Sequence, residues 1–206
     1  FALLVLSASC FLLPLAKAVD WPQWRGINRD GISSETISPA SWGKDGPKQL
    51  WKKGVGTGVS SVAVRGGRLY TMGNNGNMDV VFCLDANTGA EIWRHAYPQP
   101  LDDRSFEGGP AGTPTVDGDK VYTLSHEGDL FCLAASTGKV VWKKNLPRDF
   151  NGFRQKFGYA GSPLVDGDLV IVDSGGVGAS TVALDKATGA VRWKSASPIS
   201  WSSPII

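Results

Sequence analysis

Short apolar runs that alternate with glycine-containing turns make up most of this chain. Between residues 113 and 142 the runs are TPTV, KVYTLS, LFCLA and KVVWKK, separated by the turns Asp117-Gly118, Glu127-Gly128 and Ser136-Thr137-Gly138. The runs are rich in β-branched and aromatic residues, which favour strands, and Asp-Gly is typical of a tight hairpin turn. The last run ends in charged residues, as an exposed edge strand does. The pattern therefore predicts four short antiparallel strands.

The same unit occurs three times. The repeats cover residues 61–93, 113–142 and 162–193, and a fourth begins at Ser203. The repeats are nearly equal in length and the segments between them vary, as expected for folded modules joined by surface loops. Four antiparallel strands per repeat are the pattern of a β-propeller blade. We predict an all-β propeller over residues 59–206, with about three complete blades and the start of a fourth.

Each repeat ends in a related motif. The third reads Ala183-Leu-Asp-Lys-Ala-Thr-Gly-Ala-Val-Arg-Trp193, the first has Cys83 in place of the alanine, and the second has Cys132 there and Ala134 in place of the aspartate. This pattern, Ala-x-Asp-x-x-Thr-Gly-x-x-x-Trp, resembles the docking motif of the quinoprotein (PQQ-repeat) propeller family. The resemblance implies a structural role for the motif residues, which are Asp85, Thr88, Gly89, Trp93, Thr137, Gly138, Trp142, Asp185, Thr188, Gly189 and Trp193.

Each position of the motif has a predicted structural role. Glycine permits a positive φ in the last turn of the repeat, and the aspartate and threonine side chains can accept hydrogen bonds from backbone N–H groups there. Tryptophan can bury its ring against the neighbouring blade and place its N–H on a backbone acceptor. Ala134 lacks the carboxylate, so we predict a weaker turn in the second repeat. Cys83 and Cys132 hold the same strand position one blade apart, and we interpret both as small core residues beyond disulfide reach.

The N-terminal region divides into two parts. Residues 1–18 are almost wholly apolar and end in Ala16-Lys17-Ala18, which predicts a secretory signal peptide and an exported protein, periplasmic or extracellular. Residues 19–58 precede the first repeat. Their Leu50-Trp-Lys-Lys53 resembles the outer strand of a blade and implies, within the family, a strand that closes the ring. Asn28-x-Asp-Gly31 lacks the flanking acids of a calcium loop, so we interpret it as a turn.

Composition excludes several classes of protein. With 42% hydrophobic residues, 26 glycines and a net charge of +2, the chain is neither disordered nor collagen-like, and no basic stripe predicts nucleic-acid binding. After signal cleavage no segment is apolar for long enough to cross a membrane. There is no Cys/His cluster, so no metal site is predicted. His95 and His126 are isolated, so we expect surface positions for both and predict no catalytic residues.

Two long connectors between repeats are the best candidates for binding. Residues 98–110 and 147–159 should lie on one face of the ring near its axis, and they combine charges with aromatic side chains as binding surfaces do. The candidate residues are Asp102, Asp103, Arg104, Glu107, Arg154 and Lys156. Ordinary loops that pack on each other would show the same composition, so this alternative stays open.

Two functions remain. The first is an exported non-catalytic propeller that binds a protein or a small molecule, or acts as a scaffold, without a cofactor; the family resemblance includes an outer-membrane assembly scaffold. The second, also implied by the resemblance, is a PQQ-dependent alcohol or sugar dehydrogenase that uses calcium. Its cofactor ligands would lie mainly in further blades, because this sequence has no Cys-Cys dipeptide. Three blades are fewer than the usual four to eight, so we expect a part of a longer ring.

Overall fold

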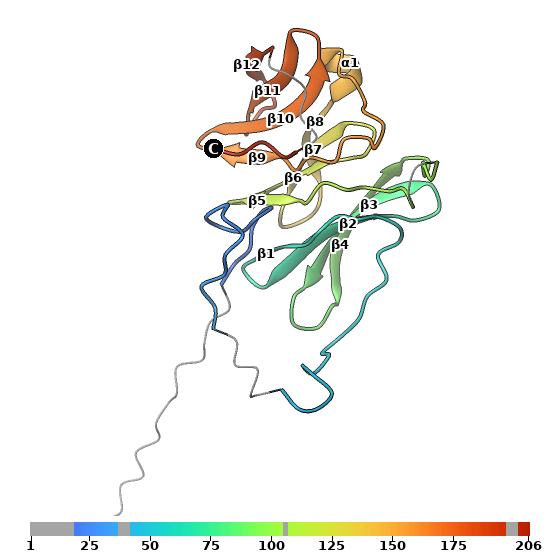
Figure 1. The fold of residues 1–206 in the computed structure, drawn as a ribbon, viewed down its shortest axis with the longest axis vertical. Helices are drawn as coiled ribbons and strands as arrows, with labels where there is room; N and C mark the ends of the chain where they lie inside the picture. Colours follow the sequence, from blue (N-terminus) through green and yellow to red (C-terminus); the bar gives the residue numbers. More distant parts are fainter. Residues whose placement is uncertain (1–18, 37–41, 105–106, 197–201) are drawn as a thin grey trace, which may run out of the picture.

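Three four-stranded antiparallel sheets make up the body of the molecule. A computed structural model describes residues 19–36, 42–104, 107–196 and 202–206, so the predicted signal peptide lies outside the described residues. Within each sheet the strands follow the order of the sequence. The three sheets succeed one another along the long axis of the molecule (Figure 1). The predicted all-β fold with three complete propeller blades is confirmed.

Each blade contains four strands in meander order. The first blade consists of β1 (Ala63–Arg65), β2 (Arg68–Asn74), β3 (Met78–Asp85) and β4 (Glu91–Pro98). The second consists of β5 (Thr115–Asp117), β6 (Lys120–Leu124), β7 (Asp129–Ala134) and β8 (Val140–Asn145). The third consists of β9 (Leu164–Asp166), β10 (Leu169–Gly176), β11 (Ala179–Asp185) and β12 (Val191–Ser195).

The register of the strands is the same in the three blades. Cys83 pairs with Tyr70 and Trp93, and Cys132 pairs with Tyr122 and Trp142. In the third blade Ala183 holds this place, between Ile171 and Trp193. A shift in register follows this position on the last strand pair of each blade. The blades can therefore be compared residue by residue.

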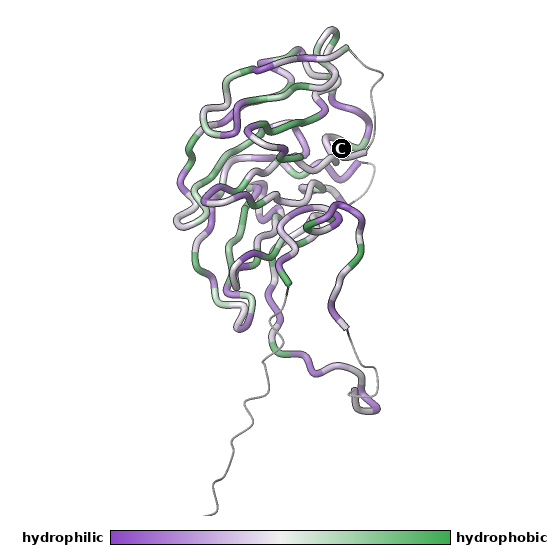
Figure 2. The backbone as a smooth tube through the Cα atoms, turned by 90° about the vertical axis from the view of Figure 1, so that its left-hand side faces the viewer, coloured by the Kyte–Doolittle hydropathy of each residue, from purple (hydrophilic) through white to green (hydrophobic). Residues whose placement is uncertain are grey.

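The hydrophobic core lies between neighbouring blades. One cluster joins side chains of the first and second blades, among them Tyr70, Met72 and Phe131, and another joins the second blade to the third. Hydrophobic and hydrophilic segments alternate along the backbone through the body of the molecule (Figure 2). Cys83 and Cys132 are buried free thiols within these clusters. Because a single blade cannot bury both of its faces, the contacts between blades hold the array together.

The motif tryptophans lie at these contacts. Nε1 of Trp93 donates to the carbonyl of Ala135 over 2.9 Å, and Nε1 of Trp142 donates to the carbonyl of Lys186 over 3.0 Å. The two rings lie against Gly138 and Gly189, the turn glycines of the following blade. Each tryptophan therefore docks on the next blade, whereas Trp193, in the last described strand, is 41% exposed.

Trp51 makes the same contact from outside the blades. Its Nε1 donates to the carbonyl of Ala86 over 3.0 Å, and its ring lies against Gly89 of the first blade. Residues 50–53 form no strand, so this tryptophan docks without the strand that the sequence suggests around it. A ring-closing role for this segment stays a prediction.

The middle turn differs from the other two. In the first blade Oδ1 of Asp85 accepts hydrogen bonds from the backbone N–H groups of Asn87 and Thr88 and from the Thr88 hydroxyl. Asp185 makes the equivalent three bonds in the third blade. In the second blade the N–H of Thr137 reaches only the backbone carbonyl of Ala134, at 3.1 Å. The missing carboxylate thus removes a small network of hydrogen bonds.

The N-terminal stretch crosses the first strands of all three blades. Trp21 exchanges two backbone hydrogen bonds with Val64, and the carbonyl of Pro22 accepts from the N–H of Val116. Arg29 donates to the carbonyl of Val165 over 2.5 Å. Residues 28–31 form a turn, as the sequence predicts. Sequence reasoning did not find that this stretch ties the blades together.

The chain after the third blade continues the pattern of the earlier blades. The N–H of Thr113 donates to Oγ of Ser162, and the N–H of Ser162 donates to Oγ of Ser203. Ser203 therefore accepts from the start of the third blade the same hydrogen bond that Ser162 accepts from the start of the second. Residues 202–206 form no strand. Among the described residues, no helix is both long enough and apolar enough to cross a membrane.

Candidate binding face at the inter-blade connectors

The two connectors lie at one end of the blades. Each leaves the last strand of a blade and enters the first strand of the next, so it shares this end with the turn between the second and third strands. The second connector begins with α1 (Leu146–Phe150), a short helix that the sequence does not predict. The Asn145 side chain caps this helix by accepting a hydrogen bond from the N–H of Arg148, and Asn151 ends it in a left-handed conformation.

Arg154 ties the two connectors together. Its guanidinium donates to Asp102 of the first connector over 2.5 Å and to Glu127, in the β6–β7 turn, over 2.6 Å. A second arginine, Arg104, donates to both oxygens of Asp102 over 2.7 and 2.9 Å. Three segments far apart in the sequence therefore meet at one partly buried guanidinium. Sequence reasoning named Asp102, Arg104 and Arg154 but not their contact.

His126 lies beneath this ion-pair network and is only 3% exposed. The expected surface position is therefore wrong for this residue. Gly158 explains the burial: it lies directly against the imidazole ring with a φ of +73°, where a side chain would collide with the ring. The next residue, Tyr159, donates its N–H to the carbonyl of His126 over 2.9 Å. A turn residue in the sequence thus becomes a buried support of the second connector.

His95 is half-buried, between the surface position that the sequence suggests and the core. Its ring lies 5.0 Å from that of Phe131 and 5.7 Å from that of Tyr97, measured between centroids. Its Nε2 is buried without a hydrogen-bond partner among the described residues. Burial, with a smaller effect from Lys143, lowers the pKa of His95. Phe131 of the second blade lies against this side chain. The sequence of the first repeat alone does not indicate this contact.

Charge in the network is arranged around arginine. The hydrogen bonds from Arg104, with those from Arg154, hold the pKa of Asp102 well below its usual range. Burial and the positive charge of Arg154 lower the pKa of His126, so the ring is neutral at pH 7. Asp102, His126 and Glu127 bring ligand atoms within 4.8 Å of one another, a spacing that could hold a metal ion. Arg154 already supplies the cation to both carboxylates, so we assign the cluster as an ion-pair network.

The remaining predicted residues lie at the solvent side of this face. Asp103, Glu107 and Lys156 are exposed, and Nζ of Lys156 lies 5.4 Å from the ring centre of Phe157. Phe153 and Phe157 are 63% and 41% exposed. We refer to the exposed residues Arg104, Phe153, Lys156 and Phe157 as the connector patch. It combines large apolar rings with positive charge on a base held by Arg154.

A buried carboxylate supports the first connector. Asp79, in β3, is fully buried, and its Oδ1 accepts a hydrogen bond from Nδ2 of Asn74 over 2.9 Å. The same amide nitrogen donates to the carbonyl of Gln99, at the start of the connector. Burial raises the pKa of Asp79 to about 6. The sequence offered a weak signal for this residue, an acidic side chain within an otherwise apolar strand.

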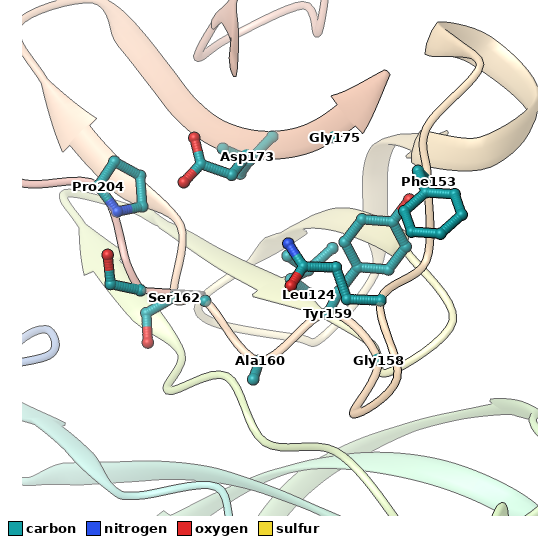
Figure 3. Close-up of a pocket in the computed structure, with 13 residues that line it drawn as sticks. Leu124, Phe153, Gly158, Tyr159, Ala160, Ser162, Asp173, Gly175 and Pro204 are labelled. Carbon is teal, nitrogen blue, oxygen red and sulfur yellow. The ribbon is translucent and has the colours of Figure 1, made fainter. Parts of the chain in front are cut away.

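A small pocket opens beside the second connector (Figure 3). Leu124, Tyr159 and Val172 contribute apolar walls, Phe153 and Pro204 lie at its rim, and Asp173 is its carboxylate. In Figure 3 the carboxyl group of Asp173 points to the side of Pro204, and the rings of Tyr159 and Phe153 lie at the opposite side of the view. Sequence reasoning did not single out Asp173.

A family model described as "Outer membrane protein assembly factor BamB" (PQQ_2) matches residues 40–102 and 77–203 of this chain. No curated protein sequence matches this chain. Among solved structures, quinohemoprotein alcohol dehydrogenase from Comamonas testosteroni is 26% identical with a TM-score of 0.59, and the alignment covers 84% of this chain and 26% of that one.

Two further solved structures are similar. A europium-containing methanol dehydrogenase is 21% identical with a TM-score of 0.53, covering 71% of this chain and 26% of that one. BamB from Moraxella catarrhalis is 24% identical with a TM-score of 0.42, covering 67% of this chain and 35% of that one. The chain thus spans about a quarter of the length of the two dehydrogenases.

Proposed function

We propose that this chain, which belongs to the PQQ-repeat β-propeller family, is the non-catalytic binding part of an exported scaffold protein and docks another protein through the connector patch. Export rests on the leader pattern of residues 1–18. No cofactor takes part in this function. Fold alone does not decide function, so the proposal depends on the face that the connectors form.

The bridge by Arg154 between Asp102 and Glu127 carries the proposal. Loops that only join blades need no ion-pair network across 52 residues of sequence, whereas a binding face benefits from loops that are already in place. Protein interfaces are enriched in aromatic residues and arginine. The connector patch exposes two phenylalanine rings and Arg104. The network preorganises the loops, and the connector patch offers the contact surface.

Site-specific photo-crosslinking in the full-length protein tests this function. A photoreactive residue replaces Phe153 or Phe157, and in matched controls it replaces Ile92 or Val140, which are similarly exposed on the outer strands β4 and β8. We expect one discrete crosslinked protein from the two connector positions and none from the controls. Equal, diffuse crosslinking from all four positions would contradict the proposal.

Arg154→Met provides the second arm of this test. It keeps a flexible unbranched side chain but removes the guanidinium and with it the bridge between the connectors, so the discrete crosslink from Phe157 should weaken strongly. Arg148→Met is the matched control, because among the described residues the Arg148 guanidinium pairs with its neighbour Asp149 and with no group of the other connector. A crosslink that survives Arg154→Met unchanged would show that the bridge does not prepare this face.

A PQQ-dependent dehydrogenase is the second candidate, favoured by the 26% identity to the alcohol dehydrogenase. The described residues fit this cofactor poorly. Asp102 and Glu127 already bind Arg154, and Asp79 is sealed from solvent, so these three carboxylates are not open to a quinone and its calcium ion. Addition of PQQ and Ca²⁺ to the full-length protein decides the matter: quinone binding with dye-linked alcohol oxidation would favour the enzyme.

A further inference from the structure

The third blade departs from the other two at one position of its second strand. Met72 in β2 and Leu124 in β6 hold equivalent places, two residues after the position that faces the small residue of the third strand, and each is only 2% exposed. In β10 this place belongs to Asp173, which is partly buried. A carboxylate therefore replaces a side chain of the inter-blade core.

The cross-strand partner changes with it. Met72 faces Val81, Leu124 faces Leu130, and Asp173 faces Thr181. The hydroxyl of Thr181 donates to Oδ1 of Asp173 over 2.8 Å. An apolar pair in two blades thus becomes a hydrogen-bonded polar pair in the third. Paired replacement of this kind indicates a built polar site, because a lone carboxylate in an apolar face would be costly.

Asp173 lines the pocket beside the second connector (Figure 3). The walls from Leu124, Val172 and Tyr159 are apolar, so they favour an apolar ligand body and exclude water from its contacts. Burial raises the pKa of Asp173, and the hydrogen bond from Thr181 partly opposes this effect. Among the described residues, no lysine, arginine or histidine forms an ion pair with Asp173.

We propose that this pocket binds a small primary amine. The ammonium group pairs with the carboxylate of Asp173, and the apolar part of the molecule lies against Tyr159 and Phe153. One carboxylate in a pocket whose lining is mostly apolar matches one positive charge on an apolar body, and aromatic faces also attract cations. This site goes beyond docking of a protein on the connector patch and does not depend on it.

Calorimetric titration of the full-length protein with n-butylamine tests the site, with n-butanol as the neutral probe of equal shape. We expect the amine to bind in a one-to-one complex and at least tenfold more tightly than the alcohol. Asp173→Asn should reduce this difference to less than threefold, because the amide keeps the shape of the carboxyl group but loses its charge. Asp168→Asn, at an exposed turn residue of the same blade, should leave binding unchanged.

A double variant separates binding from folding. Asp173→Leu with Thr181→Leu restores the apolar pair of the second blade, so the protein should fold normally and lose amine binding. Two results would overturn the proposal. One is binding of n-butylamine that Asp173→Asn does not change. The other is no binding of n-butylamine by the native protein, because the pocket would then not accept an ammonium group at Asp173.

Discussion

The interface between the first and second blades and the interface between the second and third blades use the same tryptophan contact on different supports. Trp93 docks on a turn that has Ala134 in place of the motif aspartate, and Trp142 docks on a turn that Asp185 holds with three hydrogen bonds. The first interface also has the sealed carboxylate Asp79 next to it, whereas the second is filled by apolar side chains and α1. The repeated motif therefore sets the position of each tryptophan contact. The surrounding residues set how much stability the interface loses when a residue is substituted or the pH changes.

The largest effect should come from removal of the docking rings. Trp93→Ala and Trp142→Ala should each lower the free energy of unfolding by about 3–5 kcal/mol, because a large buried ring and its hydrogen bond are both lost. Chemical unfolding of the protein measures this. Trp193→Ala is the matched control, expected below about 1 kcal/mol in residues 19–206, where Trp193 is 41% exposed and docks on no described turn. Equal losses at all three positions would remove the distinction between docked and undocked rings.

Asp79 should give the first interface a pH dependence. The pKa of Asp79 is about 6 in the folded protein and near 4 when unfolded, so the folded state binds the proton more tightly. Stability from this group is therefore greatest below pH 4 and is lost as pH rises to 6, by up to about 3 kcal/mol. Asp79→Asn should flatten this dependence and raise stability at pH 8. Unfolding curves from pH 4 to 8 check it, and an unchanged slope would contradict it.

The turn glycines test both interfaces at once. Gly138→Ala and Gly189→Ala would place a methyl group 2.5 and 2.8 Å from the rings of Trp93 and Trp142, at φ values near +70°. We expect each to cost about 2 kcal/mol or more, from backbone strain and crowding together. Gly118→Ala isolates the strain, because its φ is also positive but its surroundings are open. Thermal melts should rank it as the mildest of the three.

The smallest effect should appear at the motif aspartate. Asp185→Ala should lower the free energy of unfolding by less than Gly138→Ala or Gly189→Ala does, since only three exposed hydrogen bonds of the turn are lost. Ala134→Asp should raise it by a similar amount by completing the turn on which Trp93 docks. Measured together, the two substitutions exchange the supports of the two interfaces. If Ala134→Asp is neutral, the backbone bond of Thr137 already supplies what the carboxylate would add.

Much of the fold was predictable because it repeats. Three copies of one motif located the strands, the turns and the docking tryptophans, and each copy supported the reading of the others. The candidate face was predictable only in part. The charges of Asp102, Arg104 and Arg154 were visible in the sequence, but the bridge joins residues 52 positions apart through a turn of the blade between them. Asp173 could have been found by aligning the repeats, because it breaks an otherwise apolar position.

The sequence by itself determined the blade, since hydrophobic alternation and turn chemistry act over a few residues and need no neighbour. Only the tertiary structure decided what lies between blades. It buried His126 under Gly158, placed Arg154 between two carboxylates, and set Trp51 on the first blade without a strand around it. These outcomes depend on which surfaces meet, and a desolvated charge or ring gains its partner only when two separate segments pack together. The local pattern specifies the modules, and their packing specifies the sites.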